Sequence, residues 1–319
     1  MFYNTGNFFH PSDDPLTDDD EFTPDGVMRW TESRYRKKIS AVYRAIVAAG
    51  GWSPPSVVAF CEVESRKVLD DLIYDTYLSK YNYSVIHRDS PDRRGIDVCL
   101  IYRKDILDVL SYSWHYLKDT AAVDYPTREI LYARFKTGDD TLHVIVNHWP
   151  SRRGGVLAAA GLRDDIMKTV RVLADSISCA HRGRAKIIIT GDFNAVAGDR
   201  VMQDLVKGVG LGGVDYSPRL VNLSDGTTQD VAGTYRYRGL WETIDQFIVS
   251  GWILECESGL AADSDSFTVV SQDFLLEKDP LYPGVSPFAT YRGYSYQGGY
   301  SDHLPVMLEM TVRPDRLQE

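Results

Sequence analysis

The sequence lacks several features that would place it in a specialised class. Its 319 residues contain only four cysteines, and these are widely scattered, with no pair spaced as in a zinc motif. A disulfide framework is not expected in a chain of this size. No apolar run approaches the roughly 20 residues that a membrane-spanning helix needs. No linker rich in glycine, serine or proline divides the chain. These absences argue against a zinc ribbon, a small disulfide-rich fold and a helical membrane protein.

Positive charge is also scarce. The net charge of −10 argues against a protein that grips nucleic acid through a broad basic face. It does not exclude a nuclease, because a bound metal ion neutralises phosphate locally. With 44% hydrophobic residues the chain can bury a large core. Because no linker or internal repeat is visible, we expect residues 1–319 to form a single domain, and a monomer by default.

The compartment is left open by the sequence. The first residues read as part of a strand rather than as a signal peptide. We therefore expect one of two situations. The protein is secreted or periplasmic in a bacterium, with a signal peptide that is not part of this sequence, or it is cytoplasmic.

Short apolar runs rich in valine, isoleucine and tyrosine predict strands. These runs are 57–61, 83–87, 96–102, 130–135, 142–147, 186–190, 243–250 and 306–311. Helices are predicted at 32–48, 67–74, 157–180 and 200–206. Strands and helices alternate early, but strands cluster in the middle of the chain. That mixture favours an α/β fold in which mixed sheets pack face to face with helices outside.

Residues that carry chemistry gather where the predicted strands end. One buried strand is followed by GDFN at 191–194. If the strand continues, Asp192 and Asn194 point to one side and Phe193 points into the packing. Near the far end of the chain, SDH at 301–303 precedes another strand. An Asp–His pair beside an Asp/Asn pair can activate water against a phosphate, which predicts a hydrolase.

Other strand ends supply further polar side chains. Glu62 follows a buried strand, where a carboxylate suits a hard cation such as Mg²⁺. His148 ends a strand just before Pro150, and the arginines that follow favour phosphate binding over a structural role. Asp245 lies in an otherwise buried strand and therefore needs a partner. Asn4 ends or interrupts a short apolar strand, where an isolated asparagine is usually a turn former.

Taken in order, these residues closely resemble a known superfamily. The series is Asn4, Glu62, Arg128, His148, Asp192 with Asn194, Asp245, and Asp302 with His303. It resembles the endonuclease/exonuclease/phosphatase superfamily, which includes DNase-I-like nucleases, exonuclease III-type repair enzymes, inositol polyphosphate 5-phosphatases and neutral sphingomyelinases. GDFN and SDHLPV are the most specific motifs, and the surrounding sequence resembles a bacterial branch of this superfamily. The resemblance implies a four-layer α/β/β/α sandwich of the DNase-I-like type, two mixed β-sheets flanked by helices, with the site at one edge.

The resemblance also implies a metal and a water-activating group. Glu62, helped by Asn4, would hold Mg²⁺, with Mn²⁺ or Ca²⁺ as substitutes. Asp192 would orient the attacking water. His303 would be polarised by Asp245 or Asp302 and would act as general base or phosphate contact.

Three further residues would handle the phosphate and the leaving group. The resemblance implies that Asn194 holds a phosphate oxygen as charge builds, that His148 assists the leaving group and that Arg128 binds phosphate. Arg152 follows His148 closely in the sequence, and we expect it to act as a second phosphate clamp.

The expected function is metal-dependent hydrolysis of phosphodiester, or else phosphomonoester, bonds by a nuclease-like enzyme. A lipid or inositol phosphate phosphatase, or a sphingomyelinase-like enzyme, is the alternative within the class. A binding module whose catalysis has decayed is the alternative outside it, although every expected acidic, histidine and asparagine position is filled. A glycosidase with paired carboxylates would leave His148, His303 and Asn194 unexplained.

The late segment 267–300 allows two interpretations. It carries a group of aromatic residues immediately before SDH, namely Phe288, Tyr291, Tyr294, Tyr296 and Tyr300. They form either a packed surface loop or an aromatic wall on which the substrate stacks.

Overall fold

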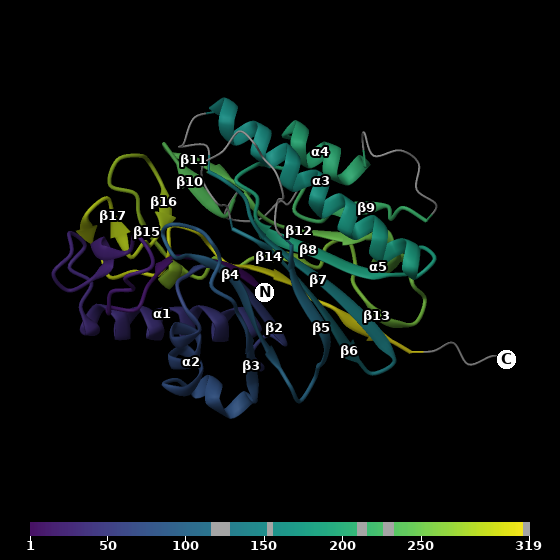
Figure 1. Cartoon of the computed structure of the whole chain (residues 1–319), viewed down its shortest axis with the longest axis horizontal. Helices are drawn as coiled ribbons and strands as arrows, with labels where there is room; N and C mark the ends of the chain where they lie inside the picture. Colours follow the sequence, from purple (N-terminus) through teal and green to yellow (C-terminus); the bar gives the residue numbers. More distant parts are fainter. Residues whose placement is uncertain (116–127, 152–155, 209–215, 226–232, 315–319) are drawn as a thin grey trace.

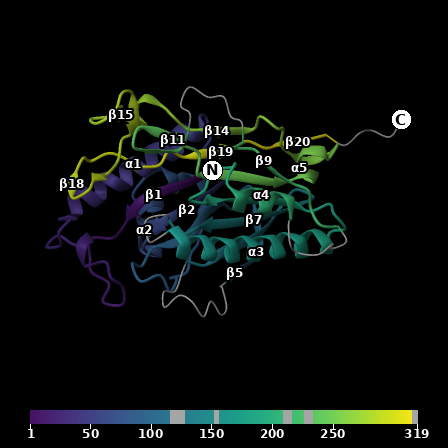
Figure 2. The ribbon, with the colours of Figure 1, turned by 90° about the horizontal axis from the view of Figure 1, so that it is seen from above.

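Two six-stranded β-sheets pack face to face, and helices cover both outer faces (Figure 1). The computed structural model describes residues 1–115, 128–151, 156–208, 216–225 and 233–314. Helices α1 (Glu32–Gly50) and α2 (Arg66–Tyr74) lie on one side of the molecule. Helices α3 (Val156–Ala180) and α4 (Arg200–Lys207) lie on the other (Figure 2). The DNase-I-like α/β/β/α sandwich expected from the sequence is confirmed.

The first sheet has the strand order β14-β19-β1-β2-β4-β3. Its strands are β1 (Phe2–Phe8), β2 (Val57–Val63), β3 (Tyr83–Ile86), β4 (Asp97–Arg103), β14 (Phe267–Val269) and β19 (Val306–Leu308). Strands β1 and β2 run parallel, whereas β19 and β4 pair with them antiparallel, so the sheet is mixed. The N-terminal strand therefore occupies the middle of this sheet.

The second sheet has the order β5-β6-β7-β8-β12-β9. Its strands are β5 (Asp108–His115), β6 (Ile130–Thr137), β7 (Asp140–His148), β8 (Lys186–Asp192), β9 (Leu220–Asn222) and β12 (Asp245–Ser250). Only the pair β7–β8 is parallel. The sequence did not predict β5, because this edge strand has no fully buried position and hence no apolar run.

Shorter elements complete the chain between and around the sheets. They are α5 (Gly251–Glu255), β10 (Tyr235–Tyr237), β11 (Leu240–Glu242), β13 (Gly259–Ala261), β15 (Leu276–Lys278), β16 (Val285–Pro287), β17 (Tyr291–Arg292), β18 (Ser295–Tyr296), β20 (Thr311–Arg313) and 3-10 turns at Asp20–Phe22, Tyr77–Tyr81 and Asp273–Leu275. In the described part of the chain, no helix is both long and apolar enough to cross a membrane.

Strand alternation divides the core into two clusters. On β8, Ile188 belongs to the large cluster between the sheets. Its neighbours Ile187 and Ile189 belong to the cluster that packs beneath α3 and α4. The even-numbered side chains of β8 therefore face the first sheet, and Asp192 at the end of the strand inherits that direction.

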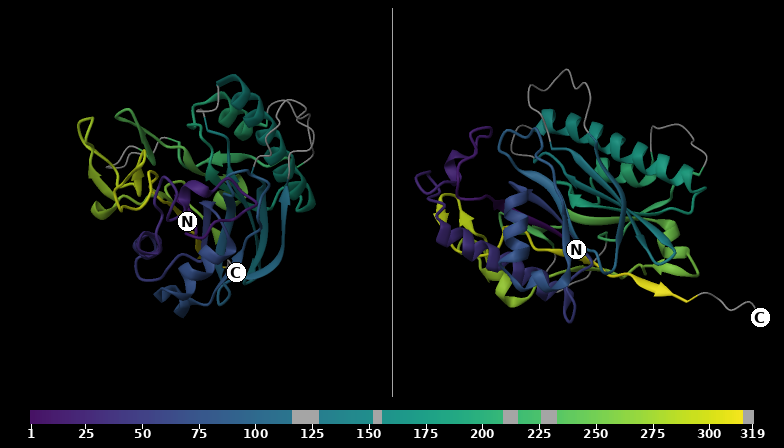
Figure 3. Two further views of the ribbon diagram at one scale, coloured as in Figure 1. Left: turned by 60° about the vertical axis from the view of Figure 1, so that its left-hand side comes forward. Right: turned by 60° about the horizontal axis from the view of Figure 1, so that its bottom comes forward.

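The late aromatic segment packs against the start of the chain (Figure 3). The hydroxyl of Tyr291 donates to the carbonyl of Met28, 2.9 Å away, and its ring lies beside Trp30. The ring of Tyr296 lies 4.3 Å under the guanidinium of Arg34. Phe288 and Tyr300 pack into the main core, whereas Tyr294 is exposed. The packed-loop interpretation therefore describes four of the five aromatic residues.

Candidate active site

Three neighbouring strands of the second sheet end in one row of polar side chains. The β7–β8 register pairs His148 with Asp192, and the β8–β12 register pairs Asp192 with Asp245. Residues directly opposite each other in a sheet point to the same face. The row therefore points between the sheets, as Ile188 does, and all three side chains are buried.

A turn after β8 brings Asn194 beside Asp192. A Cβ on Gly191 would lie 2.2 Å from the carbonyl oxygen of Asn147, so no side chain fits there. Strand β8 ends at Asp192. Asn194 then adopts a left-handed φ of 47°, and its backbone N–H donates to Oδ1 of Asp192 at 2.9 Å. Strand alternation therefore does not set the direction of Asn194, but Phe193 does point into the packing under α3, as predicted.

Opposite this row, β1 presents Asn4 from its interior. The side chain is 1% exposed, and its Nδ2 donates to Oδ2 of Asp192 at 3.1 Å. Its Oδ1 accepts from the backbone N–H of Gly6 at 3.0 Å. The interpretation of Asn4 as a strand-end turn former is corrected, because β1 continues to Phe8 between two partner strands.

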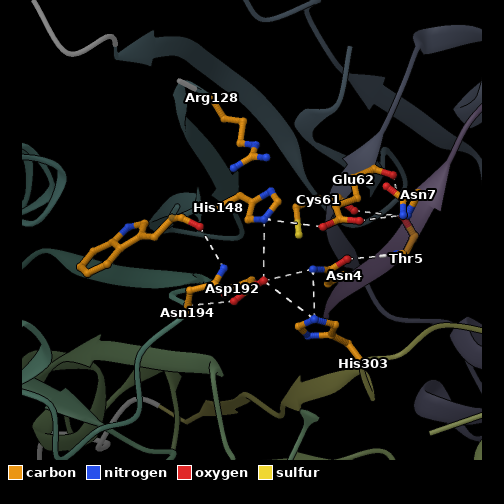
Figure 4. A network of polar contacts seen from close by, with 12 residues as sticks. Asn4, Thr5, Asn7, Cys61, Glu62, Arg128, His148, Asp192, Asn194 and His303 are labelled. Atoms are coloured by element: carbon orange, nitrogen blue, oxygen red, sulfur yellow. Dashed lines mark hydrogen bonds and ion pairs between the residues drawn. The ribbon is translucent and has the colours of Figure 1, made fainter. Parts of the chain in front are cut away.

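Strand β2 delivers Glu62 at an irregular step. The β2–β4 register shifts between Cys61 and Val63, and Glu62 itself has a positive φ of 60°. Such a bulge re-aims a side chain. Oε2 of Glu62 accepts from the N–H of Asn7 at 3.0 Å, and Oε1 lies 3.8 Å from Nε2 of His148 (Figure 4).

His303 enters the site from the segment before β19. Its Nδ1 donates to Oδ2 of Asp245 at 2.8 Å, and Asp245 is fully buried. Its Nε2 lies 3.5 Å from Nδ2 of Asn4 and 4.0 Å from Oδ2 of Asp192. Asp302, the alternative partner, is exposed. The structure therefore pairs His303 with Asp245.

The hydroxyl of Ser301 joins the two segments that carry Asn4 and His303. It donates to the carbonyl of Asn4 at 2.8 Å and accepts from the N–H of His303 at 3.1 Å. We expect Ser301→Ala to lower the free energy of unfolding by about 1–3 kcal/mol, since it leaves buried backbone groups without this partner. Urea unfolding measures the effect. The exposed Ser295 provides the control Ser295→Ala. Equal stability of the two variants would contradict the role of Ser301 in holding the two segments together.

Burial is the main cause of the shifted pKa of Asp192. It raises the pKa of Asp192 to about 7, with the charge of His303 opposing the shift and those of Asp245 and Glu62 reinforcing it. For His303, burial would lower the pKa, but the carboxylate of Asp245 prevails and holds it well above the usual value. At neutral pH the pair is therefore an imidazolium on a carboxylate.

The second histidine behaves in the opposite way. Burial, together with the positive charges of Arg128 and Arg94, holds the pKa of His148 well below its usual value. His148 is therefore a neutral imidazole at pH 7, with Nε2 lying 3.7 Å from Oδ2 of Asp192. Arg128, just before β6, extends over His148 in Figure 4. Arg152 lies outside the described residues.

A cavity of about 540 Å³ opens at this edge of the sandwich. It is lined by Asn7, Glu62, Arg94, Arg128, His148, Ser151, Asp192, Asn194, Tyr235, Tyr237, Glu242, Ile244, Asp302 and His303. In the described chain, none of the five aromatic residues expected as a stacking wall is among them. The rings at the cavity are instead Tyr235 and Tyr237 of β10, and Tyr235 lies 4.8 Å from the His303 ring. The alternation in TYRYRGLWE, a hairpin pattern, was the available signal.

Two places in the described residues bring three potential metal-ligating side chains together. In the group His87, Asp89 and Asp97, Nε2 of His87 donates to Asp97 at 2.9 Å, a pairing that ties β3 to β4. The other group is Asp192, Asp245 and His303, all buried. His303 and Asp245 bond each other, and Asp192 lines the cavity together with the carboxylates of Glu62, Glu242 and Asp302.

The chain is similar to a known family in sequence and to known proteins in structure. Residues 1–312 match the model of a family described as the endonuclease/exonuclease/phosphatase family. A mannosyl-6-phosphatase from Bacteroides thetaiotaomicron has a similar structure, with a TM-score of 0.58, 15% identity, and coverage of 97% of this chain and 98% of that one. A functionally unknown conserved protein from Enterococcus faecalis gives 0.57 at 15% identity, with 98% of each chain covered. The catalytic domain of human Nocturnin gives 0.52 at 15% identity, with 87% of each covered. No curated protein sequence matches the chain.

Proposed function

This chain belongs to the endonuclease/exonuclease/phosphatase family, and from that premise we propose that it is a divalent-metal-dependent hydrolase of phosphate esters. The proposal covers phosphodiester and phosphomonoester substrates. The observation that carries it is the row His148–Asp192–Asp245, which meets Asn4, Glu62 and His303 at one cavity. Phosphate ester hydrolysis needs charge neutralised on the phosphate, an aligned water and a stabilised leaving oxygen.

The donor set fits a small hard cation. Oε1 of Glu62 takes no part in the backbone bond to Asn7, and Oδ1 of Asn4, which accepts one hydrogen bond from Gly6, keeps a second lone pair. Few protein ligands, mostly carboxylate, are the usual way in which Mg²⁺ is held. Glu62 with Asn4 would therefore hold Mg²⁺, and Mn²⁺ or Ca²⁺ would substitute. The bound cation would supply positive charge to the non-bridging oxygens of the substrate phosphate.

The residues of the chain would divide the remaining tasks. Asp192, with a pKa of about 7, is suited to orient water and accept its proton. The protonated His303 would attract a phosphate oxygen, with Asp245 holding its ring. Asn194 donates one amide hydrogen to the carbonyl of Trp149, which fixes its side chain so that the rest of the amide addresses the phosphate.

The other side of the cavity would serve the leaving group. His148 is neutral in the free protein, so it would assist by donating a hydrogen bond from Nε2 rather than as a charged acid. Arg128 would neutralise phosphate charge next to it. We propose Asp302 as a residue of the cavity mouth, since it is exposed there.

The test is hydrolysis of a substrate panel with Mg²⁺, Mn²⁺ or EDTA. The panel contains p-nitrophenyl phosphate, bis-p-nitrophenyl phosphate, single-stranded DNA, RNA, sugar phosphates, inositol phosphates and sphingomyelin. We expect EDTA-sensitive turnover, and we expect Glu62→Gln to raise the Mg²⁺ concentration for half-maximal rate by about tenfold or more. The exposed Glu309 provides the control Glu309→Gln.

The panel also separates the alternatives. The preferred substrate decides between a nuclease, a sugar or inositol phosphatase and a sphingomyelinase-like enzyme. Turnover that is unaffected by EDTA would contradict the metal site. Absence of turnover on every substrate, with the protein folded and Mg²⁺ bound, would favour a binding module on the same fold.

A further inference from the structure

Two arginines at the mouth of the cavity share one carboxylate. Nε of Arg128 lies 3.1 Å from Oδ2 of Asp92, and both side chains are about nine-tenths buried, each 11% exposed. Nε of Arg94 lies 3.9 Å from Oδ1 of the same Asp92, and the Arg94 side chain is 48% exposed. Both arginines line the cavity that holds Asp192 and His303. Arg128 is therefore the inner cation and Arg94 the outer one.

The loop that carries Arg94 is held in place by its own hydrogen bonds. The N–H of Arg94 donates to Oδ1 of Asp92, and the N–H of Gly95 donates to the carbonyl of Asp92, each at 3.0 Å. Gly95 has a positive φ of 64°, and a Cβ there would lie 2.8 Å from the Thr17 side chain. The backbone beneath Arg94 is thus fixed before any ligand arrives, which lowers the entropy lost on binding.

Around Asp92, the positive charges outnumber the negative one. Two guanidinium groups face one carboxylate, whereas the chain as a whole carries a net charge of −10. The part of the cavity lining that carries Arg94 and Arg128 is therefore suited to an anion.

We propose that Arg94, backed by Arg128, forms a second anion subsite that binds a phosphate group of the substrate other than the one hydrolysed. The inference rests on the proposed function of the cavity and narrows its substrate to compounds with two phosphate groups. A phosphate is favoured over a carboxylate because its greater charge and three terminal oxygens suit the Arg94 fork with the positive charge of Arg128 behind it, while the Arg128 fork itself would serve the phosphate that is hydrolysed.

Isothermal titration calorimetry of the Asp192→Asn protein with Mg²⁺ tests the subsite without turnover of the probe. The probes are fructose 1,6-bisphosphate, fructose 6-phosphate and 6-phosphogluconate. We expect the bisphosphate to bind about tenfold more tightly than fructose 6-phosphate, the scale of one charge-assisted hydrogen-bonded contact. Adding Arg94→Ala should remove that preference, and Arg94→Lys should keep part of it.

The neighbouring Arg93 supplies a matched control. It is 60% exposed, its guanidinium pairs with Asp18, 3.2 Å away, and it is not among the residues that line the cavity. Arg93→Ala should keep the full preference for the bisphosphate. A preference that survives Arg94→Ala, or is absent from the parent protein, overturns the subsite, and equal binding of 6-phosphogluconate overturns its assignment to phosphate. A bisphosphate preference without turnover of any substrate by the wild-type protein would contradict the proposed function alone.

Discussion

Replacing Asp192 by asparagine is expected to lower kcat by at least about 100-fold and to leave the protein folded, because a preorganised group that acts on the transition state is worth about 3 kcal/mol or more. The amide keeps the shape, and its oxygen still accepts from the N–H of Asn194, whereas its NH2 group cannot accept from Nδ2 of Asn4. It cannot accept a proton from water. Steady-state kinetics with Mg²⁺ on the best substrate of the panel measures the loss.

The same change is expected to stabilise the metal-free protein. The pKa of Asp192 is raised from 3.8 to about 7, so the folded state holds a proton that the unfolded chain has released between these values. Its contribution to the free energy of unfolding is therefore present below pH 3.8 and lost as pH rises through 7. We expect Asp192→Asn to be on the order of 2 kcal/mol more stable than wild type at pH 8 in EDTA, and this gain to shrink towards pH 5.

A surface carboxylate shows whether these effects belong to the site. Asp265 is exposed and is not among the residues that line the cavity. Asp265→Asn should change neither kcat nor the pH dependence of urea unfolding measurably. A kcat for Asp192→Asn within tenfold of wild type would contradict the water-activating role. A pH dependence identical to that of wild type would contradict the buried, proton-holding carboxylate.

The sequence predicted the part of the site that lies on consecutive strand ends. His148 and Asp192 follow buried apolar runs, and local periodicity shows where such runs end. Asp245 was predicted inside the strand 243–250, whereas β12 begins at it. Pro150 marks the end of one run because proline cannot continue a strand inside a sheet. Gly191 marks another, because no side chain fits beside the carbonyl of Asn147. That these three site residues meet at one edge of the sandwich was implied by the resemblance to the family. These residues were therefore accessible without the structure.

The features that the sequence did not predict depend on contacts between residues far apart in the chain. Asn4 faces Asp192 only because β1 inserts into the middle of the first sheet. Lys38 has the spacing of a solvated helical lysine, yet it is buried, and its Nζ donates to the carbonyls of Thr5 and Tyr300. Burial of a charge against distant carbonyl groups leaves no periodic signal in the sequence. The pairing of His303 with Asp245 rather than Asp302 likewise depends on contacts between distant residues, so the sequence left it open.

The pairing of His303 with Asp245 leads to the second prediction, a large loss of both stability and activity. Asp245 is fully buried, and its charge is compensated by the imidazolium of His303 at 2.8 Å. Removing one member of a buried ion pair costs about 3–5 kcal/mol, because the other charge remains uncompensated. We expect His303→Gln to reduce the free energy of unfolding by that amount and kcat by at least about 100-fold. Asp302→Asn, a change at the exposed neighbour, should have much smaller effects on both.

Combining His303→Gln with Asp245→Asn separates the two roles of the pair. The double variant replaces two charges by two amides that can hydrogen-bond each other, so no buried charge is left unpaired. Its free energy of unfolding should therefore recover most of what His303→Gln loses, whereas kcat should stay as low as in the single variant. A double-mutant cycle from urea unfolding and kinetics measures both quantities. Additive losses of stability would show that His303 and Asp245 act independently, and recovery of kcat would show that the imidazole takes no part in the reaction.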